Sequence, residues 1–109
     1  MPESKIPAAD IAFVDNTEAH RFEASVKGQL AAYAEYTLPK DAIMFTHTEV
    51  MPEFEGKGIG SAIARHVLDA ARARQLQVIP VCQFIAGYIR KHPEYVDIVQ
   101  PASRVAFKI

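Results

Sequence analysis

A strand pattern and a helix pattern meet in the stretch Val50-Met51-Pro52-Glu53-Phe54-Glu55-Gly56-Lys57-Gly58-Ile59-Gly60-Ser61. Glycine occupies the alternate positions 56, 58 and 60. Because glycine has no side chain, its backbone N–H group can approach a ligand closely. The first N–H groups of the following helix lack internal acceptors, and that helix end carries roughly half a positive charge. The stretch therefore predicts a site for the phosphate or pyrophosphate of a cofactor.

Short strands are expected on both sides of this stretch, at residues 11–14, 21–26, 29–38, 42–50 and 78–81. Residues 21–26 alternate between apolar and polar side chains, which is typical of a half-buried strand. Lys27-Gly28 predicts a tight turn, since Gly28 can adopt the positive φ that such turns need. The returning strand is expected to place five side chains on one face: Leu30, Ala32, Ala34, Tyr36 and Leu38.

The strand over 42–50 carries the first candidates for chemistry. Period two predicts one face with Ile43, Phe45, His47 and Glu49 and the other with Met44, Thr46, Thr48 and Val50. His47 and Glu49 would then lie roughly 7 Å apart along the strand. At that separation the two side chains can contact one ligand.

Downstream of the glycines the apolar period changes from two to three or four, which predicts an amphipathic helix over 59–74. A parallel strand at 78–81 would complete a right-handed crossover. A second helix is expected over 84–91 and ends before Pro93. One more strand is possible at 105–107. The predicted fold class is α/β (α+β), with a mixed, mainly antiparallel sheet and a β-α-β crossover.

Length and composition predict one domain, over residues 10–109, behind a loose tail at 1–9. The net charge of −1 gives no basic surface for nucleic acid. No apolar stretch is long enough to cross a membrane or to act as a secretory leader. The single cysteine fits a reducing cytoplasm. His20 and His66 have no partners at metal-ligand spacing, so no metal site is expected.

The glycine pattern fits neither the dinucleotide fingerprint nor the P-loop. A glycine turn after an antiparallel meander, opening a long helix, instead resembles the GNAT superfamily of acetyl-CoA-dependent N-acetyltransferases. Their signature, Gln/Arg-x-x-Gly-x-Gly/Ala, reads here with Glu55 at its first position. Four motifs resemble the minimal single-domain branch of that superfamily: His47-Thr48-Glu49-Val50, Gly56 to Gly60, Ile79-Pro80-Val81-Cys82 and His92-Pro93-Glu94-Tyr95.

The resemblance implies that acetyl-CoA or CoA binds at the glycine turn. The residues implied to hold it are Val50, Glu55, Gly56, Lys57, Gly58, Ile59, Gly60 and Ser61. Glu53 and Glu55 should repel the pyrophosphate and Lys57 should offset part of that repulsion, so we expect modest affinity. The short link between the first two strands leaves no room for acceptor-site helices, which predicts an open acceptor site or one completed by a partner.

Three side chains are candidates for catalysis, each with a structural alternative. His47 suits a general base at neutral pH, or packs on the sheet. Cys82 follows the fifth strand and could carry the acetyl group or protonate a thiolate, or it is a buried small hydrophobe. The resemblance makes Tyr88 a candidate acid toward the CoA sulfur; the alternative is a ring in the core.

The leading hypothesis is an N-acetyltransferase with an unknown amine or protein acceptor, transferring directly or through Cys82. The alternatives are a CoA-binding or protein-interaction module with little turnover, and a purely structural domain. The sequence leaves the acceptor and the oligomeric state open.

Overall fold

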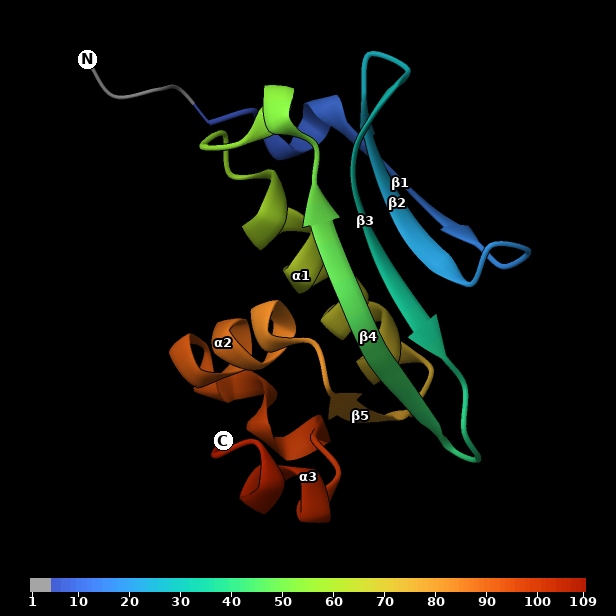
Figure 1. Cartoon of the computed structure of the whole chain (residues 1–109), viewed down its shortest axis with the longest axis vertical. Helices are drawn as coiled ribbons and strands as arrows, with labels where there is room; N and C mark the ends of the chain where they lie inside the picture. The colour runs from blue at the N-terminus through green and yellow to red at the C-terminus, as the bar shows by residue number, and fades with distance from the viewer. Residues whose placement is uncertain (1–4) are drawn as a thin grey trace.

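The computed structural model describes residues 5–109, which form one five-stranded sheet and the helices packed on it. The strands are β1 (Ile11–Asn16), β2 (Arg21–Val26), β3 (Gln29–Thr37), β4 (Ala42–Val50) and β5 (Gln77–Pro80). They lie side by side in chain order. The first four are antiparallel to their neighbours and β5 runs parallel to β4 (Figure 1). The predicted meander and the mixed sheet are confirmed.

Helix α1 (Ile59–Ala73) joins β4 to β5 and packs on β2, β3 and β4. Its buried stripe has the three-to-four spacing that the sequence predicts: Ile59, Ile63, Ala64, Val67, Leu68 and Ala71. The N-cap residue is Gly58, which has no side chain to cap the first turn of the helix. The glycine turn therefore opens directly into the helix that covers the sheet. Within residues 5–109, no helix is long and apolar enough to cross a membrane.

After β5 the chain forms α2 (Gln83–Lys91), the 3-10 helix η3 (Pro93–Ile98) and α3 (Pro101–Ala106). The expected strand at 105–107 is wrong. Pro101 occupies the first turn of α3, where its fixed φ suits a helix. The C-terminal segment touches the sheet through a bridge between Val99 and Val78, with Gln100 N–H donating to the Val78 carbonyl at 2.9 Å.

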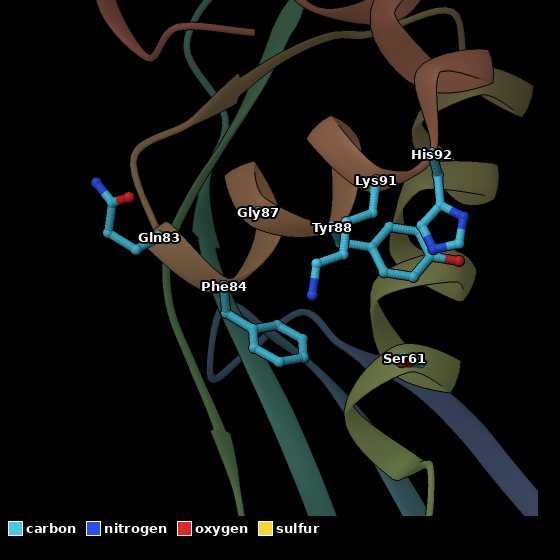
Figure 2. A pocket seen from close by; sticks show the side chains of 7 residues that line it. All are labelled: Ser61, Gln83, Phe84, Gly87, Tyr88, Lys91 and His92. Carbon is cyan, nitrogen blue, oxygen red and sulfur yellow. The ribbon is translucent and has the colours of Figure 1, made fainter.

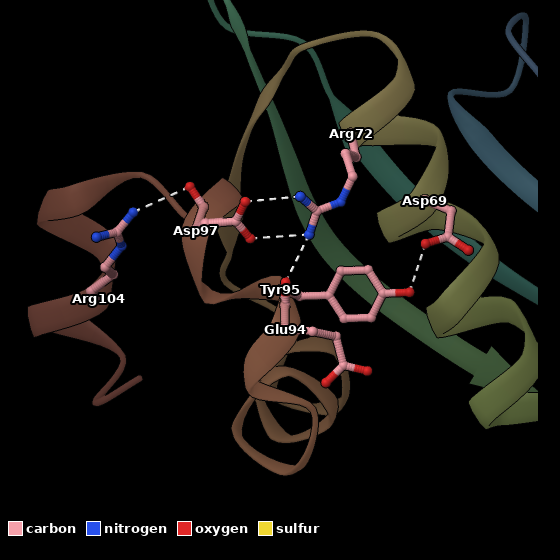
Figure 3. A network of polar contacts seen from close by, with 6 residues as sticks. All are labelled: Asp69, Arg72, Glu94, Tyr95, Asp97 and Arg104. Carbon is pink, nitrogen blue, oxygen red and sulfur yellow. Dashed lines mark hydrogen bonds and ion pairs between the residues drawn. The ribbon is translucent and has the colours of Figure 1, made fainter.

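Polar contacts fasten η3 to α1 (Figure 3). Arg72 of α1 donates to both carboxylate oxygens of Asp97, at 2.8 and 3.0 Å, and to the Glu94 carbonyl at 2.7 Å. Tyr95 is buried and donates to Asp69 of α1 at 2.6 Å. His92-Pro93-Glu94-Tyr95 thus serves as a turn and a packing segment in this fold.

A β-bulge in β4 changes which side chains face the helices. Glu35 pairs with His47 and Tyr36 with Phe45, so Thr46 is the extra residue. Beyond it, Thr48 and Val50 pair with Ala34 and Ala32, which are fully buried. Directly paired residues share a face of the sheet. The predicted grouping of Ile43 and Phe45 with His47 and Glu49 is therefore wrong, because period two assumes an unbroken strand.

A second bulge lies between Ala24 and Ser25, opposite Ala31 of β3. Ala32, Ala34 and Tyr36 share the buried face as predicted, and Ala31 is buried as well. Leu30 is half-buried, and Leu38 lies outside β3 with half of its surface exposed. The predicted five-residue face is therefore correct only in its middle.

The segment before β1 lies against the glycine turn. Ile6 N–H donates to the Lys57 carbonyl at 3.0 Å, and Ala8–Asp10 forms a 3-10 helix. A loose tail was predicted for residues 1–9, and residues 1–4 of it lie outside the part of the chain that the structure describes. Residues 5–9 run beside the turn that links β4 to α1.

Candidate functional site

The loop between β4 and α1 presents a row of backbone donors. The 3-10 helix η2 (Pro52–Phe54) ends β4, and Gly56 and Gly58 then adopt positive φ angles of 78° and 82°. Within residues 5–109, none of the N–H groups from Gly56 to Ser61 makes a well-formed backbone hydrogen bond; the first that does is that of Ala62, at 3.1 Å from the Gly58 carbonyl. An anion at this helix end would accept hydrogen bonds from these groups.

This loop forms a pocket of about 260 Å³. Seven of the eight predicted cofactor residues line it: Val50, Glu55, Gly56, Gly58, Ile59, Gly60 and Ser61. The eighth, Lys57, lines a different pocket, beside the N-terminal segment. The loop pocket therefore lacks the positive side chain that the sequence prediction placed there.

The two acidic residues of the loop take different directions. Glu55 is exposed and lines the loop pocket. Glu53 accepts a hydrogen bond from the Gln29 side-chain amide at 3.2 Å, which holds it toward the β2–β3 hairpin. The expected repulsion of an anion in the loop pocket thus comes from one adjacent carboxylate instead of two.

A second pocket of about 260 Å³ continues from the first along α2 (Figure 2). The two pockets share Ser61 and Phe84, so they form one surface groove between the ends of α1 and α2. Gly60 allows the start of α2 to lie close to the start of α1, because a Cβ at Gly60 would lie 2.7 Å from the Phe84 ring. In Figure 2 the Lys91 side chain extends toward Phe84, which brings one cation to the groove.

Tyr88 lies in this α2 pocket, stacked on His92 with ring centroids 3.9 Å apart. Burial raises the pKa of the Tyr88 phenol. The phenol is therefore protonated at neutral pH and is available as a donor to a ligand in the groove.

Strands β4 and β5 separate at the point where Cys82 lies. Their pairing runs from Ala42–Gln77 to Phe45–Pro80, and Cys82 N–H donates to the Phe45 carbonyl at 2.8 Å. Among the described residues, β4 pairs with β3 alone from His47 to Val50, and the bulge residue Thr46 has no partner in either strand. Alternate N–H and C=O groups on the other edge of this segment are free to pair with an extended ligand over roughly 15 Å.

Cys82 contacts β4 across this gap, with its Sγ 3.4 Å from Thr48 Oγ1. It is the N-cap of α2, where the helix dipole favours negative charge. Its side chain is buried, with 7% exposed, and it lines neither half of the groove. A thioester would reach it by entering between β4 and α2.

His47 lies on the opposite face of β4 from Thr48, since neighbouring strand residues point to opposite faces. Its Nε2 is 3.2 Å from Glu49 Oε1, and Tyr33 donates to the same oxygen at 3.4 Å. His47 and Glu49 are each about half exposed. The structure thus brings His47 together with Glu49, as their spacing predicts, and leaves both on the other side of β4 from Cys82.

Sequence reasoning missed several residues of the site, including Gln83 and Gly87 of the α2 pocket. Thr48 contacts Cys82, Phe84 divides the groove, and Phe54 forms part of its floor. Thr48 would have required knowledge of the bulge at Thr46. Phe84 carries one signal in the sequence, an aromatic residue at the start of a predicted helix, which does not mark it as a partner of Gly60. Among residues 5–109, no three His, Cys, Asp or Glu side chains gather closely enough to hold a metal ion.

Comparison with known proteins agrees with this architecture. The family model described as GCN5-related N-acetyl-transferase matches residues 21–98, from β2 to the end of η3. The chain belongs to the GCN5-related N-acetyltransferase family. Membership makes it an enzyme of the acetyltransferase class, and the resemblance inferred from the glycine turn is confirmed.

Three curated proteins and one solved structure align with more than half of this chain. NATD1 of Xenopus tropicalis is 25% identical over 104 residues, 91% of this chain and 94% of that protein. The NATD1 proteins of Gallus gallus and Mus musculus are each 30% identical over 64 residues, 57% of this chain and 58% of theirs. The solution structure of a GCN5-like protein from Staphylococcus aureus has a TM-score of 0.65 at 22% identity, covering 84% of this chain and 90% of that one, and shows the same fold.

Proposed function

We propose that the protein transfers the acetyl group of acetyl-CoA to an amine, with the pyrophosphate of the cofactor at the N–H groups of the glycine turn. The observation that carries this proposal is the row of donors at the glycine turn, where Gly56 and the residues from Gly58 to Ser61 line a pocket at the start of α1. The free edge of β4 from Thr46 to Val50 supports a path for the amide-containing pantetheine arm, leading from this pocket toward Cys82.

The acceptor amine must be neutral before it attacks. For a lysine-type amine this costs about 4–5 kcal/mol at neutral pH. His47 is the proposed base, held by Glu49 on the open face of the sheet. In the direct route the amine attacks the thioester carbon, the CoA thiolate leaves, and Tyr88 is the proposed proton donor to that sulfur. Loss of the amine proton to His47 completes the amide.

In the covalent route Cys82 acts first. Its thiolate attacks the thioester carbon and CoA leaves as the thiolate; the amine then takes the acetyl group and the Cys82 thiol is restored. The position of Cys82 at the start of α2 supports this route. A single-turnover reaction with labelled acetyl-CoA separates the two. Label on wild-type protein and on Thr48→Val, but not on Cys82→Ala, supports the covalent route; acetyl transfer by Cys82→Ala at the wild-type rate contradicts it.

Cofactor binding is tested by thermal shift and calorimetry with CoA and acetyl-CoA. At a hundredfold excess over Kd, a ligand stabilises the folded state by about 2.7 kcal/mol. Gly58→Asp should lose this stabilisation, because it places a carboxylate at the pyrophosphate site. Gly28→Asp is the matched control, since Gly28 also has positive φ, 79°, but lies at the β2–β3 turn with no atom near its Cβ position. No heat with wild-type protein at millimolar CoA contradicts the proposal.

A second candidate function is a CoA-binding module with little turnover. The separation of His47, Cys82 and Tyr88 favours it, because neither half of the groove contains more than one of the three. This alternative predicts stabilisation by CoA without acetylation of any small amine, peptide lysine or protein N-terminus. Measurable acetyl transfer to one of these acceptors would contradict this alternative.

A further inference from the structure

A pocket of about 420 Å³ borders the glycine turn and is separate from the groove between α1 and α2. Its walls are the N-terminal segment, the β2–β3 hairpin, and the residues Phe54 and Lys57 of the β4–α1 loop. Of the residues that the structure describes, Phe54 is the one that this pocket shares with the loop pocket. The family chemistry described above makes no use of it.

Three of the six lysines in the chain line this pocket: Lys5, Lys27 and Lys57. Within residues 5–109, none of the three forms an ion pair. Asp10 also lines the pocket, so the lining residues among 5–109 carry an excess of two positive charges. Because the whole chain has a net charge of −1, this local excess does not follow from its composition.

Apolar side chains lie between these charges. Val26 and Phe54 are buried, and Ile6 and Pro7 form the facing wall. The backbone fixes this wall in place, since Ile6 N–H is bonded to the Lys57 carbonyl and the Lys5 stem lies over Gly58. A ligand with an apolar body and anionic groups on its rim would complement this lining.

We propose that this pocket binds an organic phosphate of nucleotide type, with its apolar body against Ile6, Pro7 and Phe54 and its phosphates near the lysines. Such a ligand has two sources: a free nucleotide, or the 3′-phosphoadenosine end of CoA itself. In either case Lys57 and Phe54 connect this pocket to the loop that holds the proposed pyrophosphate site. The proposal that this pocket binds an organic phosphate does not depend on the proposed acetyl transfer.

The test is calorimetric titration with adenosine 3′,5′-bisphosphate at low ionic strength. We expect binding to wild-type protein, and an affinity about tenfold weaker in the double variant Lys5→Gln/Lys27→Gln. A tenfold change in affinity corresponds to roughly 1.4 kcal/mol, and each exposed ion pair that the variant loses contributes a fraction of that free energy. Raising the salt should weaken it further. Lys40→Gln is the control, because Lys40 is an exposed lysine outside the pocket. Circular dichroism checks that each variant is folded.

The outcomes separate the sources and the proposals. Binding that persists at saturating CoA assigns the pocket to a free nucleotide, and competition assigns it to the cofactor's own end. No heat, equal affinity in the double variant, or equal weakening by Lys40→Gln overturns the proposal, and equal affinity for inorganic phosphate overturns the role of the apolar wall. Loss of CoA binding with bisphosphate binding retained counts against the proposed function alone.

Discussion

At the scale of single residues, Gly60 sets how closely α1 and α2 approach. A Cβ at this position would lie 2.7 Å from Phe84 Cζ and 3.4 Å from Val50. We expect Gly60→Ala to destabilise the fold by about 1–3 kcal/mol, as overpacking does. Because the clash is with the far end of the Phe84 ring, Gly60→Ala/Phe84→Leu should recover most of this loss. Urea unfolding of the two variants measures both values, and a double variant no more stable than Gly60→Ala would contradict the explanation.

At the scale of elements, His66 couples α1 to the sheet through aromatic contacts. Its ring stacks on Phe13 of β1, 4.2 Å between centroids, and meets Phe22 of β2 edge-on at 5.9 Å. Burial lowers the pKa of His66 below its ordinary value of 6.5, against an opposing effect of Asp69. The unfolded chain therefore binds a proton more readily than the folded one. The stability that this contributes is complete above pH 6.5 and is lost as the pH falls toward the lowered pKa.

Urea midpoints between pH 8 and pH 5 test this linkage. Wild-type protein should lose stability over that range, and His66→Gln should show a flatter profile, whatever its stability at pH 8. Identical slopes for the two proteins would show that other groups cause the pH dependence.

The periodicity of hydrophobic residues within each strand and helix determined how much of the fold could be predicted from the sequence. Alternation along β2 and the three-to-four period of α1 are local, so both elements were predictable. The bulge at Thr46 was not, because it adds a residue without altering the residue types around it, and every side chain after it changes face. His47 and Cys82 were both catalytic candidates, yet Thr48 is the residue of β4 whose side chain contacts the Cys82 side chain. The donors of the glycine turn were predictable because they belong to the backbone.

At the scale of the whole molecule, one arginine joins the C-terminal segment to the helix that covers the sheet. Arg72 holds the carboxylate of Asp97 and the Glu94 carbonyl (Figure 3). Its guanidinium keeps the pKa of Asp97 below the ordinary 3.8. The stabilisation from this pair is present above pH 3.8 and is lost as the pH falls through the lowered pKa. Acid should therefore begin to loosen this attachment only as the pH falls below 3.8.

Removing the guanidinium should loosen the same region at neutral pH. In Arg72→Ala we expect the backbone amides of η3 and α3 to exchange with deuterium severalfold faster, because three hydrogen bonds to that segment are lost. Amides in β2 and β3 should keep their protection, since the sheet and α1 retain their own core. Arg65→Ala is the control: Arg65 approaches Asp69 only at 3.9 Å and both side chains are more than half exposed. Equal exchange in the two variants would mean that Val78–Val99 and Tyr95–Asp69 hold the segment without Arg72.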